Sequence, residues 1–339
     1  MLKVFSNIFA LGVMSVGPAQ AQSSPLDFFA GKKISVIIGY AAGGTYDTIA
    51  RLLTRHMGKH IPGQPAMVPQ NTPGVAVRSI LHLYAAAPND GTALGMLART
   101  YPIEPVFNPE NAKYLPARFN PIGSTSTEVS VGVVWHTHRI NSLKDLEQRE
   151  ITTGSTGFTD DTGRFALLTN NLAGTRIRVV TGYPGGNDIT AAMERGEVDA
   201  RFGWSWGSLK SRSKPWLDDK KINIIVQMAL EKAPDLPDVP LVMEFAKNSL
   251  DRQALELLMA PQALAWPLVA PPGVPAERVT QLRRAFDATM RDSAFLSEAT
   301  KMRIDVEPVT GEAMQKIVEQ LASFDRKVVD RALQLIAVQ

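Results

Sequence analysis

Short apolar runs alternate along the chain with segments in which apolar residues recur every three or four positions. In the N-terminal part, apolar runs cover 33–39, 66–71 and 93–98, and the segment 45–57 has the spacing of an amphipathic helix. Apolar runs of this length are typical of buried strands, and amphipathic segments are typical of the helices that cover a sheet. The β-α-β-α-β order therefore predicts a parallel sheet with right-handed crossover connections.

The alternation restarts near residue 124. Further strand-like runs follow at 129–135, 150–155, 176–183, 197–203 and 222–230. The C-terminal third is predicted to be mainly helical, over about 241–259, 275–290 and 310–336. Two α/β units in one chain, followed by a helical return, predict a ligand cleft between the units.

In open α/β sheets, ligands bind outside the carboxyl ends of the strands. The loops predicted there are rich in Gly, Ser, Thr and aromatic residues, and they are Tyr40–Asp47, Arg99–Pro102, Gly154–Phe158, Tyr183–Asp188 and Phe202–Gly207. Within or beside these loops, the candidates with useful side chains are Tyr40, Arg99, Thr100, Arg201 and Trp204.

The first loop joins a strand to a helix through two glycines. Gly43 and Gly44 let backbone amides approach a ligand, and the following helix N-terminus offers free N–H groups and partial positive charge. The spacing fits neither G-x-G-x-x-G nor a P-loop, and a plain strand-to-helix turn is the alternative. Asp47 in the first helical turn is expected to order this loop, leaving the Gly43–Thr45 amides for a ligand; the alternative is a hydrogen bond from a ligand hydroxyl or ammonium to Asp47.

The loop "TTGSTGFTDD" repeats this arrangement in the second unit. Ser155, Thr156 and Gly157 offer amides and hydroxyls just before a predicted helix. Two facing helix N-termini could hold the two ends of a dicarboxylate without any cation. The alternative is an ordinary capped turn.

Two arginines are candidates for a charged anchor. Arg99 and Arg201 follow or lie within strands whose ends point at the cleft, and arginine pairs with carboxylates through two parallel hydrogen bonds. For each, pairing with a nearby acid such as Asp199 is the competing interpretation. Trp204 and Trp206 could form either apolar pocket walls or core.

Catalytic and metal-binding patterns are poorly supported. "GWSWG" around Ser205 fits G-x-S-x-G, but all five histidines precede it, whereas α/β-hydrolases need a later one. His56 and His60 have i, i+4 spacing, but Met57 stands where a zinc protease needs Glu. The chain has no cysteine, which excludes thiol catalysis and thiolate metal sites. We predict a protein that is not an enzyme and has no metal or cofactor.

The N-terminal sequence has the features of an export signal. One Lys, an apolar run from Val4 to Val16 and a small-x-small site at 19–21 come in the order of a signal peptide, so we assign residues 1–21 to it. The absence of cysteine excludes a lipid anchor on an N-terminal Cys, and a periplasmic location is expected. The formal net charge of +3, without a basic cluster, argues against nucleic-acid binding.

Six motifs in sequence order resemble those of the solute-binding receptors of tripartite tricarboxylate transporters, the Bug family. They are "AAGGTYDTIAR" (41–51), "VPQNTPGVAV" (68–77), "PNDGTAL" (88–94), "YPGGNDITAAMERGEVD" (183–199), "LPDVP" (236–240) and "APPGVPAERVTQLRRAFD" (270–287). The resemblance covers nearly all of the chain after the predicted signal peptide.

The resemblance implies a two-domain periplasmic-binding-protein fold that closes on its ligand like a flytrap. It implies residues 25–123 plus 240–339 as a discontinuous first domain and 124–239 as the second. It also implies a carboxylate held mainly by backbone amides and hydroxyls of Ala42, Gly43, Gly44, Thr45, Asp47, Ser155, Thr156, Gly157 and Tyr183.

The implied function is capture of an organic acid by a monomer that delivers it to membrane permease subunits. Arg201, Trp204 and Trp206 are not part of the family's motifs, and they make a longer or aromatic acid plausible. Two other functions stay open: a flytrap that reports ligand to a signalling partner, and an exported hydrolase using Ser205.

Overall fold

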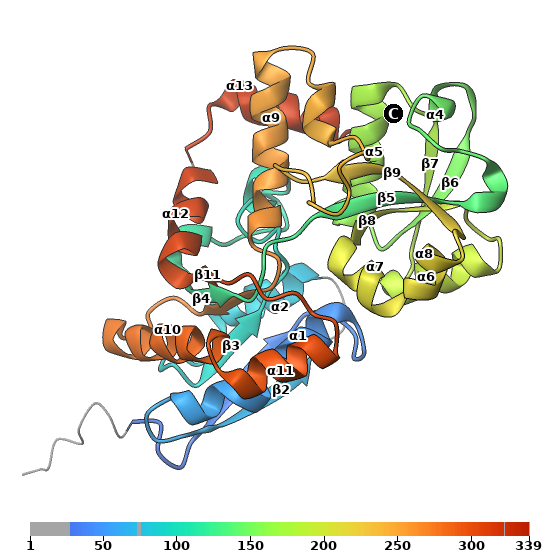
Figure 1. The fold of residues 1–339 in the computed structure, drawn as a ribbon. Coiled ribbons are helices and arrows are strands. Elements are labelled where there is room, and N and C mark those ends of the chain that lie inside the picture. The colour runs from blue at the N-terminus through green and yellow to red at the C-terminus, as the bar shows by residue number, and fades with distance from the viewer. Residues whose placement is uncertain (1–27, 73–75, 322, 339) are drawn as a thin grey trace, which may run out of the picture.

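The computed structural model describes residues 28–72, 76–321 and 323–338. The predicted signal peptide and residues 73–75 of the second motif lie outside this description. Two α/β units lie against each other, one around β1–β4 and the other around β5–β9 (Figure 1). The predicted fold class is confirmed.

The first sheet has six strands in the order β11-β4-β10-β3-β1-β2. Their bounds are β1 Lys33–Ile38, β2 Ala66–Asn71, β3 Ala93–Met96, β4 Asn120–Ser124, β10 Pro267–Ala270 and β11 Val309–Thr310. β1 pairs in parallel with β2 and β3, as the sequence pattern predicts. β10 and β11 are antiparallel to their neighbours, which the pattern did not predict.

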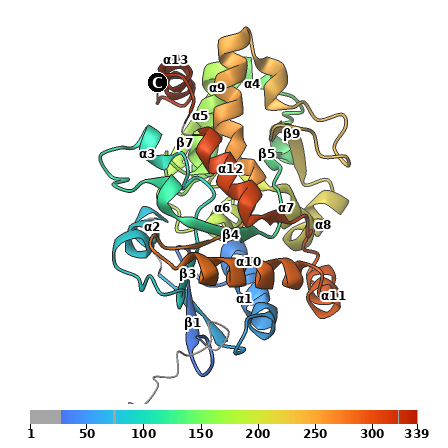
Figure 2. The ribbon, with the colours of Figure 1, turned by 90° about the vertical axis from the view of Figure 1, so that its left-hand side faces the viewer.

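Helices cover both faces of this sheet. They are α1 Thr45–Met57, α2 Ala76–Ala85, α10 Ala276–Met290, α11 Ser293–Lys301 and α12 Gly311–Leu321. The apolar stripe of α1 packs on one face together with α10 and α11, while α2 and α12 contribute to the core on the other face. Figure 2 shows α10 crossing this unit in front of β3 and β4.

The second sheet has five strands in the order β7-β6-β8-β5-β9. Their bounds are β5 Ser130–Trp135, β6 Ile151–Ser155, β7 Ile177–Thr181, β8 Ala200–Ser205 and β9 Ile222–Met228. The helices between β5 and β9 in the chain are α4 Asp145–Gln148, α5 Asp161–Ala173, α6 Gly186–Glu194, α7 Trp206–Arg212 and α8 Lys214–Asp218. Residues of α5 pack on one face, and residues of α6, α7 and α8 pack on the other.

Two C-terminal helices join the core of the second unit. α9 Ser249–Met259 and α13 Arg326–Leu335 bury leucines, alanines and valines in the same cluster as Phe165 and Phe202. Both helices lie within the range that the predicted division gives to the first domain. The predicted helix 310–336 is two helices, of which α12 packs in the first unit and α13 in the second.

Short elements complete the described chain. They are α3 Glu104–Phe107 and the 3₁₀ turns Gly58–His60, Pro116–Arg118, His136–His138, Val242–Phe245 and Ala260–Ala263. Within the described ranges, no helix is long and apolar enough to cross a membrane.

Two of the crossings between the units lie side by side. One runs from β4 to β5, and the other returns towards β10. The Glu128 amide donates to the Gln262 carbonyl at 2.7 Å, and the Ala265 amide donates to the Ser126 carbonyl at 3.2 Å. This paired segment holds the two sheets with the carboxyl ends of β1 and β6 near the boundary between the units.

Candidate functional site

The first loop is ordered by Asp47. Its carboxylate accepts hydrogen bonds from the Gly43 amide at 2.8 Å, from Arg51 Nε at 2.8 Å and from Asn71 Nδ2 at 2.9 Å. Burial opposes the charged form, but these hydrogen bonds together hold the pKa of Asp47 below its usual value. The Gly43 amide is therefore occupied in this conformation, so the expectation that it is left free for a ligand is wrong, while the ordering role of Asp47 is confirmed.

The first loop lies against the second unit. Thr45 Oγ1 lies 3.1 Å from Ser208 Oγ on α7, and Arg212 Nη1 donates to the Gly43 carbonyl at 2.8 Å. Arg212 Nη2 also reaches Thr48 Oγ1 at 2.6 Å. These contacts join the first loop and the start of α1 to α7, which lies 163 to 169 residues later in the chain, and they close the boundary between the units.

Tyr40 connects the first loop with the N-terminus of α5. Its ring stacks on Tyr46 with a centroid distance of 4.3 Å. Burial first, then the Tyr46 hydroxyl and the carboxylates of Asp160 and Asp161, raise the pKa of Tyr40. The two loops are linked through Arg99, whose amide bonds to Tyr46 and whose side chain bonds to Asp161.

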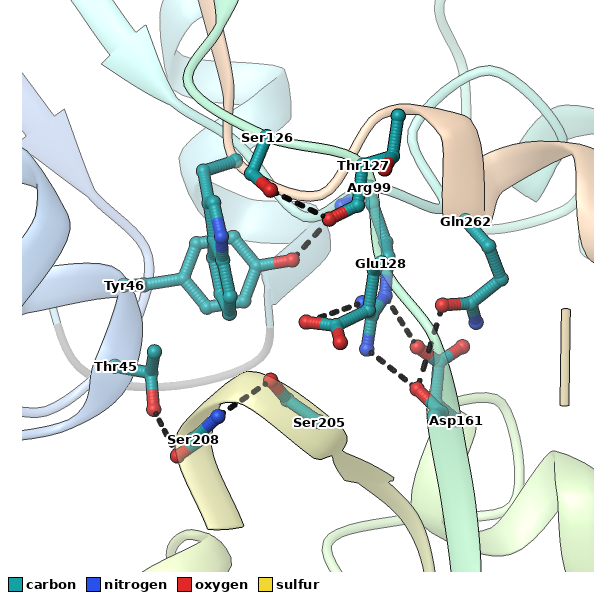
Figure 3. A network of polar contacts seen from close by, with 12 residues as sticks. Thr45, Tyr46, Arg99, Ser126, Thr127, Glu128, Asp161, Ser205, Ser208 and Gln262 are labelled. Carbon is teal, nitrogen blue, oxygen red and sulfur yellow. Dashed lines mark hydrogen bonds and ion pairs between the residues drawn. The ribbon is translucent and has the colours of Figure 1, made fainter. Parts of the chain in front are cut away.

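Arg99 forms an ion pair across the boundary. Its Nε lies 2.6 Å from Asp161 Oδ2, its Nη1 lies 3.6 Å from Glu128 Oε2, and its Nη2 donates to Ser130 Oγ at 3.4 Å (Figure 3). The Arg99 amide donates to the Tyr46 hydroxyl at 3.1 Å. All these groups are buried or nearly so, and two carboxylates lie beside the Arg99 guanidinium.

The charges of this network act on each other. Burial disfavours the charged guanidinium, but the carboxylates, Asp161 foremost, raise the pKa of Arg99. Burial raises the pKa of Glu128, and Arg99 partly opposes that shift. Arg99 thus resembles an inter-unit tie more than a free anion receptor, which is the competing interpretation that the sequence left open.

A cavity of about 470 Å³ lies beside this network, between the units and the crossings. Its wall includes Thr45, Trp266, Ser205, Ser208, Glu128 and Gln262. This volume is in the range of small-molecule sites. The hydroxyls and the Gln262 amide suit polar groups, and the charged lining is mixed, with Lys210 and Lys232 as well as acids such as Asp235.

The polar groups of the second loop form hydrogen bonds with each other and with the start of α5. Ser155 Oγ donates to the Gly157 carbonyl at 2.9 Å and accepts from the Gly157 amide at 3.0 Å. The Thr156 amide donates to Thr162 Oγ1 at 3.1 Å, and the Thr156 hydroxyl donates to Asp160 at 2.8 Å. In this conformation the loop has the bonding of a capped turn.

Arg201 differs from Arg99 in its partners. Its Nη1 donates to the Gly186 carbonyl at 3.0 Å and to Thr190 Oγ1 at 2.9 Å. Its guanidinium carbon lies 4.3 Å from the centroid of Trp204, which is 3% exposed and belongs to the core. Asp199 instead accepts hydrogen bonds from Thr152, so the pairing of Arg201 with Asp199 is wrong.

The serine and histidine candidates have structural partners. Ser205 Oγ caps α7 by accepting from the Ser208 amide at 3.1 Å. His56 and His60 lie beside Glu298 and Asp292. Among the described residues, no group of three or more His, Asp or Glu side chains is placed to hold a metal ion.

Sequence reasoning missed several residues at the boundary. Asp161, Glu128, Ser208 and Arg212 make the contacts between the units, and only Asp161 lies in a motif that the sequence singled out. Thr100 is buried, and its carbonyl accepts from the Ile103 and Glu104 amides, which starts α3.

The remaining predicted residues keep their positions around these contacts. Ala42 and Gly43 are exposed, whereas Gly44, Thr45, Thr156, Gly157 and Tyr183 are partly exposed. Whether they contact a ligand stays a prediction.

Comparisons with known protein structures show which fold this arrangement is. The structure of the periplasmic binding protein BugD superposes with a TM-score of 0.69, covering 91% of this chain and 97% of that chain at 18% identity. The chain has the fold of the Bug-type periplasmic solute-binding proteins. The motif resemblance is thus confirmed at the level of the fold.

Two further matches agree with the Bug-type fold. MatC from Rhodopseudomonas palustris, solved with bound malate, matches with a TM-score of 0.67, 20% identity and coverage of 91% of this chain and 100% of that one. In sequence, the chain is 25% identical over 238 residues to the UPF0065 protein in the tcbD-tcbE intergenic region of Pseudomonas sp. strain P51, which is 69% of each chain. No protein-family model matches.

Proposed function

We propose that this protein is a periplasmic solute-binding receptor that closes around an organic acid and delivers it to the membrane permease subunits of a tripartite tricarboxylate-type transporter. It acts as a monomer without catalysis and is exported by the signal peptide at 1–21. The ligand drives closure because it binds the closed arrangement more tightly than the open one.

One observation carries the proposal. Loops at the carboxyl ends of strands in both sheets meet directly, through Arg212 on Gly43 and through Arg99 on Asp161. These contacts bring the two units against each other at this edge. A receptor of this fold needs that arrangement to enclose a ligand, whereas a structural protein has no need of loops that meet across a boundary.

The nature of the ligand is supported by MatC, whose structure holds malate. A small carboxylic acid is therefore the first class of compound to test. The hydroxyl-rich cavity beside Arg99 suits the polar or hydroxylated part of such a ligand.

A thermal-shift screen tests the proposal. The purified mature protein is heated with malate, adipate, citrate, benzoate and phthalate, and with glucose and lysine as uncharged and cationic controls. A ligand present at 100 times its Kd stabilises the folded state by about 2.7 kcal/mol, which is a clear rise in Tm. No rise with any of the acids, or equal rises with the controls, would contradict the proposed function.

Export is tested separately. Mass spectrometry of the protein from a periplasmic fraction should give the mass of a chain that begins after Ala21. The full-length mass in the cytoplasmic fraction would contradict the proposed location.

A further inference from the structure

We propose that Arg201 is the receptor for the anionic end of the ligand, and that the ligand supplies the counter-charge that the protein itself omits. This inference rests on the proposed function and assigns the charged anchor of that same site. It separates Arg201, which recognises the ligand, from Arg99, which ties the units together.

The first observation is the set of partners around Arg201. Its Nη1 donates only to neutral oxygens, those of Gly186 and Thr190. Its Nε is buried and has no hydrogen-bond partner. Within the described part of the chain, no carboxylate lies at ion-pair distance, and the charged group that acts on it is another cation, Arg212.

The second observation is that the two arginines of the described chain with buried side chains, Arg99 and Arg164, each have an acid, whereas Arg201, which is partly exposed but has a buried Nε, has none. Arg99 pairs with Asp161 at 2.6 Å, and Arg164 pairs with Glu104 at 3.3 Å. Burying a cation without a counter-charge costs several kcal/mol, and a pairing partner is the usual compensation. Burial, followed by Arg212, lowers the pKa of Arg201 to about 9. A missing anion at one position therefore points to a ligand.

The third observation is the place of Arg201 in the fold. β8 runs parallel to β6, with Ala200 opposite Thr153, so Arg201 stands at the carboxyl end of β6. Gly186 begins α6, whose N-terminus has no side-chain cap. Arg201 lies over the ring of Trp204, which packs in one cluster with Trp206 and Leu209 of α7. The last residue of α7, Arg212, contacts Gly43 of the first unit, so Arg201 lies on the face of the second unit that α7 joins to the first.

The edge of the Arg201 guanidinium formed by Nε and Nη2 determines which class of chemical group can bind there. Arginine binds a carboxylate through two parallel hydrogen bonds, and the edge formed by Nε and Nη2 is one that does so. Here Nη1 is engaged and Nε is not. The structure therefore assigns a planar carboxylate to this edge, with the positive end of α6 adding to the attraction.

Gly186 supplies a variant that moves the guanidinium and keeps its charge. A Cβ at Gly186 would lie 2.2 Å from Arg201 Nη2, the far end of a flexible side chain. Gly186→Ala should therefore fold and displace the guanidinium. Arg178, which is exposed on β7 and loosely paired with Glu150, gives a control that loses the same charge elsewhere on the unit.

The test is calorimetric titration with malate, adipate, citrate, benzoate and phthalate. For each acid that binds the parent protein, Arg201→Gln should weaken binding by about 100-fold or more, because a desolvated charge pair is lost. Arg201→Lys should recover only part of the affinity, since it keeps the charge without the fork. Arg178→Gln should bind within about twofold of the parent, because an exposed, screened charge contributes little.

A double variant sharpens the test. If Gly186→Ala acts through Arg201, it should weaken binding alone but add nothing to Arg201→Gln. Equal binding by the parent and Arg201→Gln would overturn the inference and leave the proposed function standing. If no acid binds the parent, the proposed function fails and this inference fails with it. Should Arg201→Gln not fold, Arg201→Lys and Gly186→Ala still decide, since unchanged affinity in both contradicts the inference.

Discussion

Two arginines near strand ends, one in each unit, have opposite surroundings. Arg99 follows β3 in the first unit and meets Asp161 at 2.6 Å and Glu128 at 3.6 Å. Arg201 lies in β8 of the second unit and meets only a carbonyl, a hydroxyl and the face of Trp204. Arg99 has two carboxylates near its guanidinium, whereas Arg201 has no carboxylate of the described chain at ion-pair distance.

This difference separates structural from functional charge. A buried ion pair that is complete within the protein holds parts of the fold together, and breaking it is costly. A buried charge that is left incomplete lowers stability until something binds to it. The first kind of arginine should be measured by unfolding, and the second by ligand binding.

The largest effect is expected from Arg99→Gln. It leaves the Asp161 and Glu128 carboxylates near each other without a cation, which should lower the free energy of unfolding by about 3–5 kcal/mol. Urea denaturation of the mature protein measures this. The double variant Arg99→Gln with Asp161→Asn should recover part of the loss, because it removes one of the unpaired charges. A loss below about 1 kcal/mol in the single variant would remove the distinction between the arginines.

A smaller effect is expected from Asp47→Ala. It removes the acceptor of hydrogen bonds from Gly43, Arg51 and Asn71, and should lower the free energy of unfolding by about 1–3 kcal/mol. Faster hydrogen exchange at the Gly43 amide should accompany the loss. Unchanged exchange would show that Asp47 does not order the loop.

Glu128 gives the pH dependence. Its pKa is raised in the folded state above the ordinary 4.5, so folding binds a proton that the unfolded chain has released. The stabilisation from Glu128 is therefore complete below about pH 4.5 and is lost as the pH rises through the folded-state pKa. Glu128→Gln should remove this decline, so that its stability relative to the parent grows between pH 4 and 7. Parallel curves of unfolding free energy against pH would contradict this assignment.

The smallest change in stability is expected from Arg201→Gln in the absence of ligand. Because the cation has no acid to leave behind, its removal should change the free energy of unfolding by less than about 1 kcal/mol, or increase it. A loss as large as that of Arg99→Gln would mean that Arg201 has a structural role. The same denaturation series measures both arginines.

The sequence predicted the elements around the site better than the contacts between them. The glycine turn before α1 and the apolar stripe of that helix follow from local spacing, and α1 spans Thr45–Met57 as predicted. The antiparallel β10 and the return of α13 to the second unit depend on pairings between distant segments, which local patterns do not encode.

The same limit applies to the candidate site. Arg99 and Arg201 could be chosen from sequence because they sit near strand ends, but their difference could not. It depends on Asp161 being brought to Arg99 across the boundary, 62 residues away in the chain, and on Asp199 being turned towards Thr152 instead of Arg201. Partner identity in three dimensions decides which charge is complete.

The most direct test is the crystal structure of the protein with the carboxylate that gives the largest thermal shift. The account predicts a carboxylate oxygen within hydrogen-bond distance of Arg201 Nε, with the Arg99–Asp161 ion pair intact. A carboxylate bound to Arg99 in place of Asp161, with Arg201 Nε still without a partner, would contradict it.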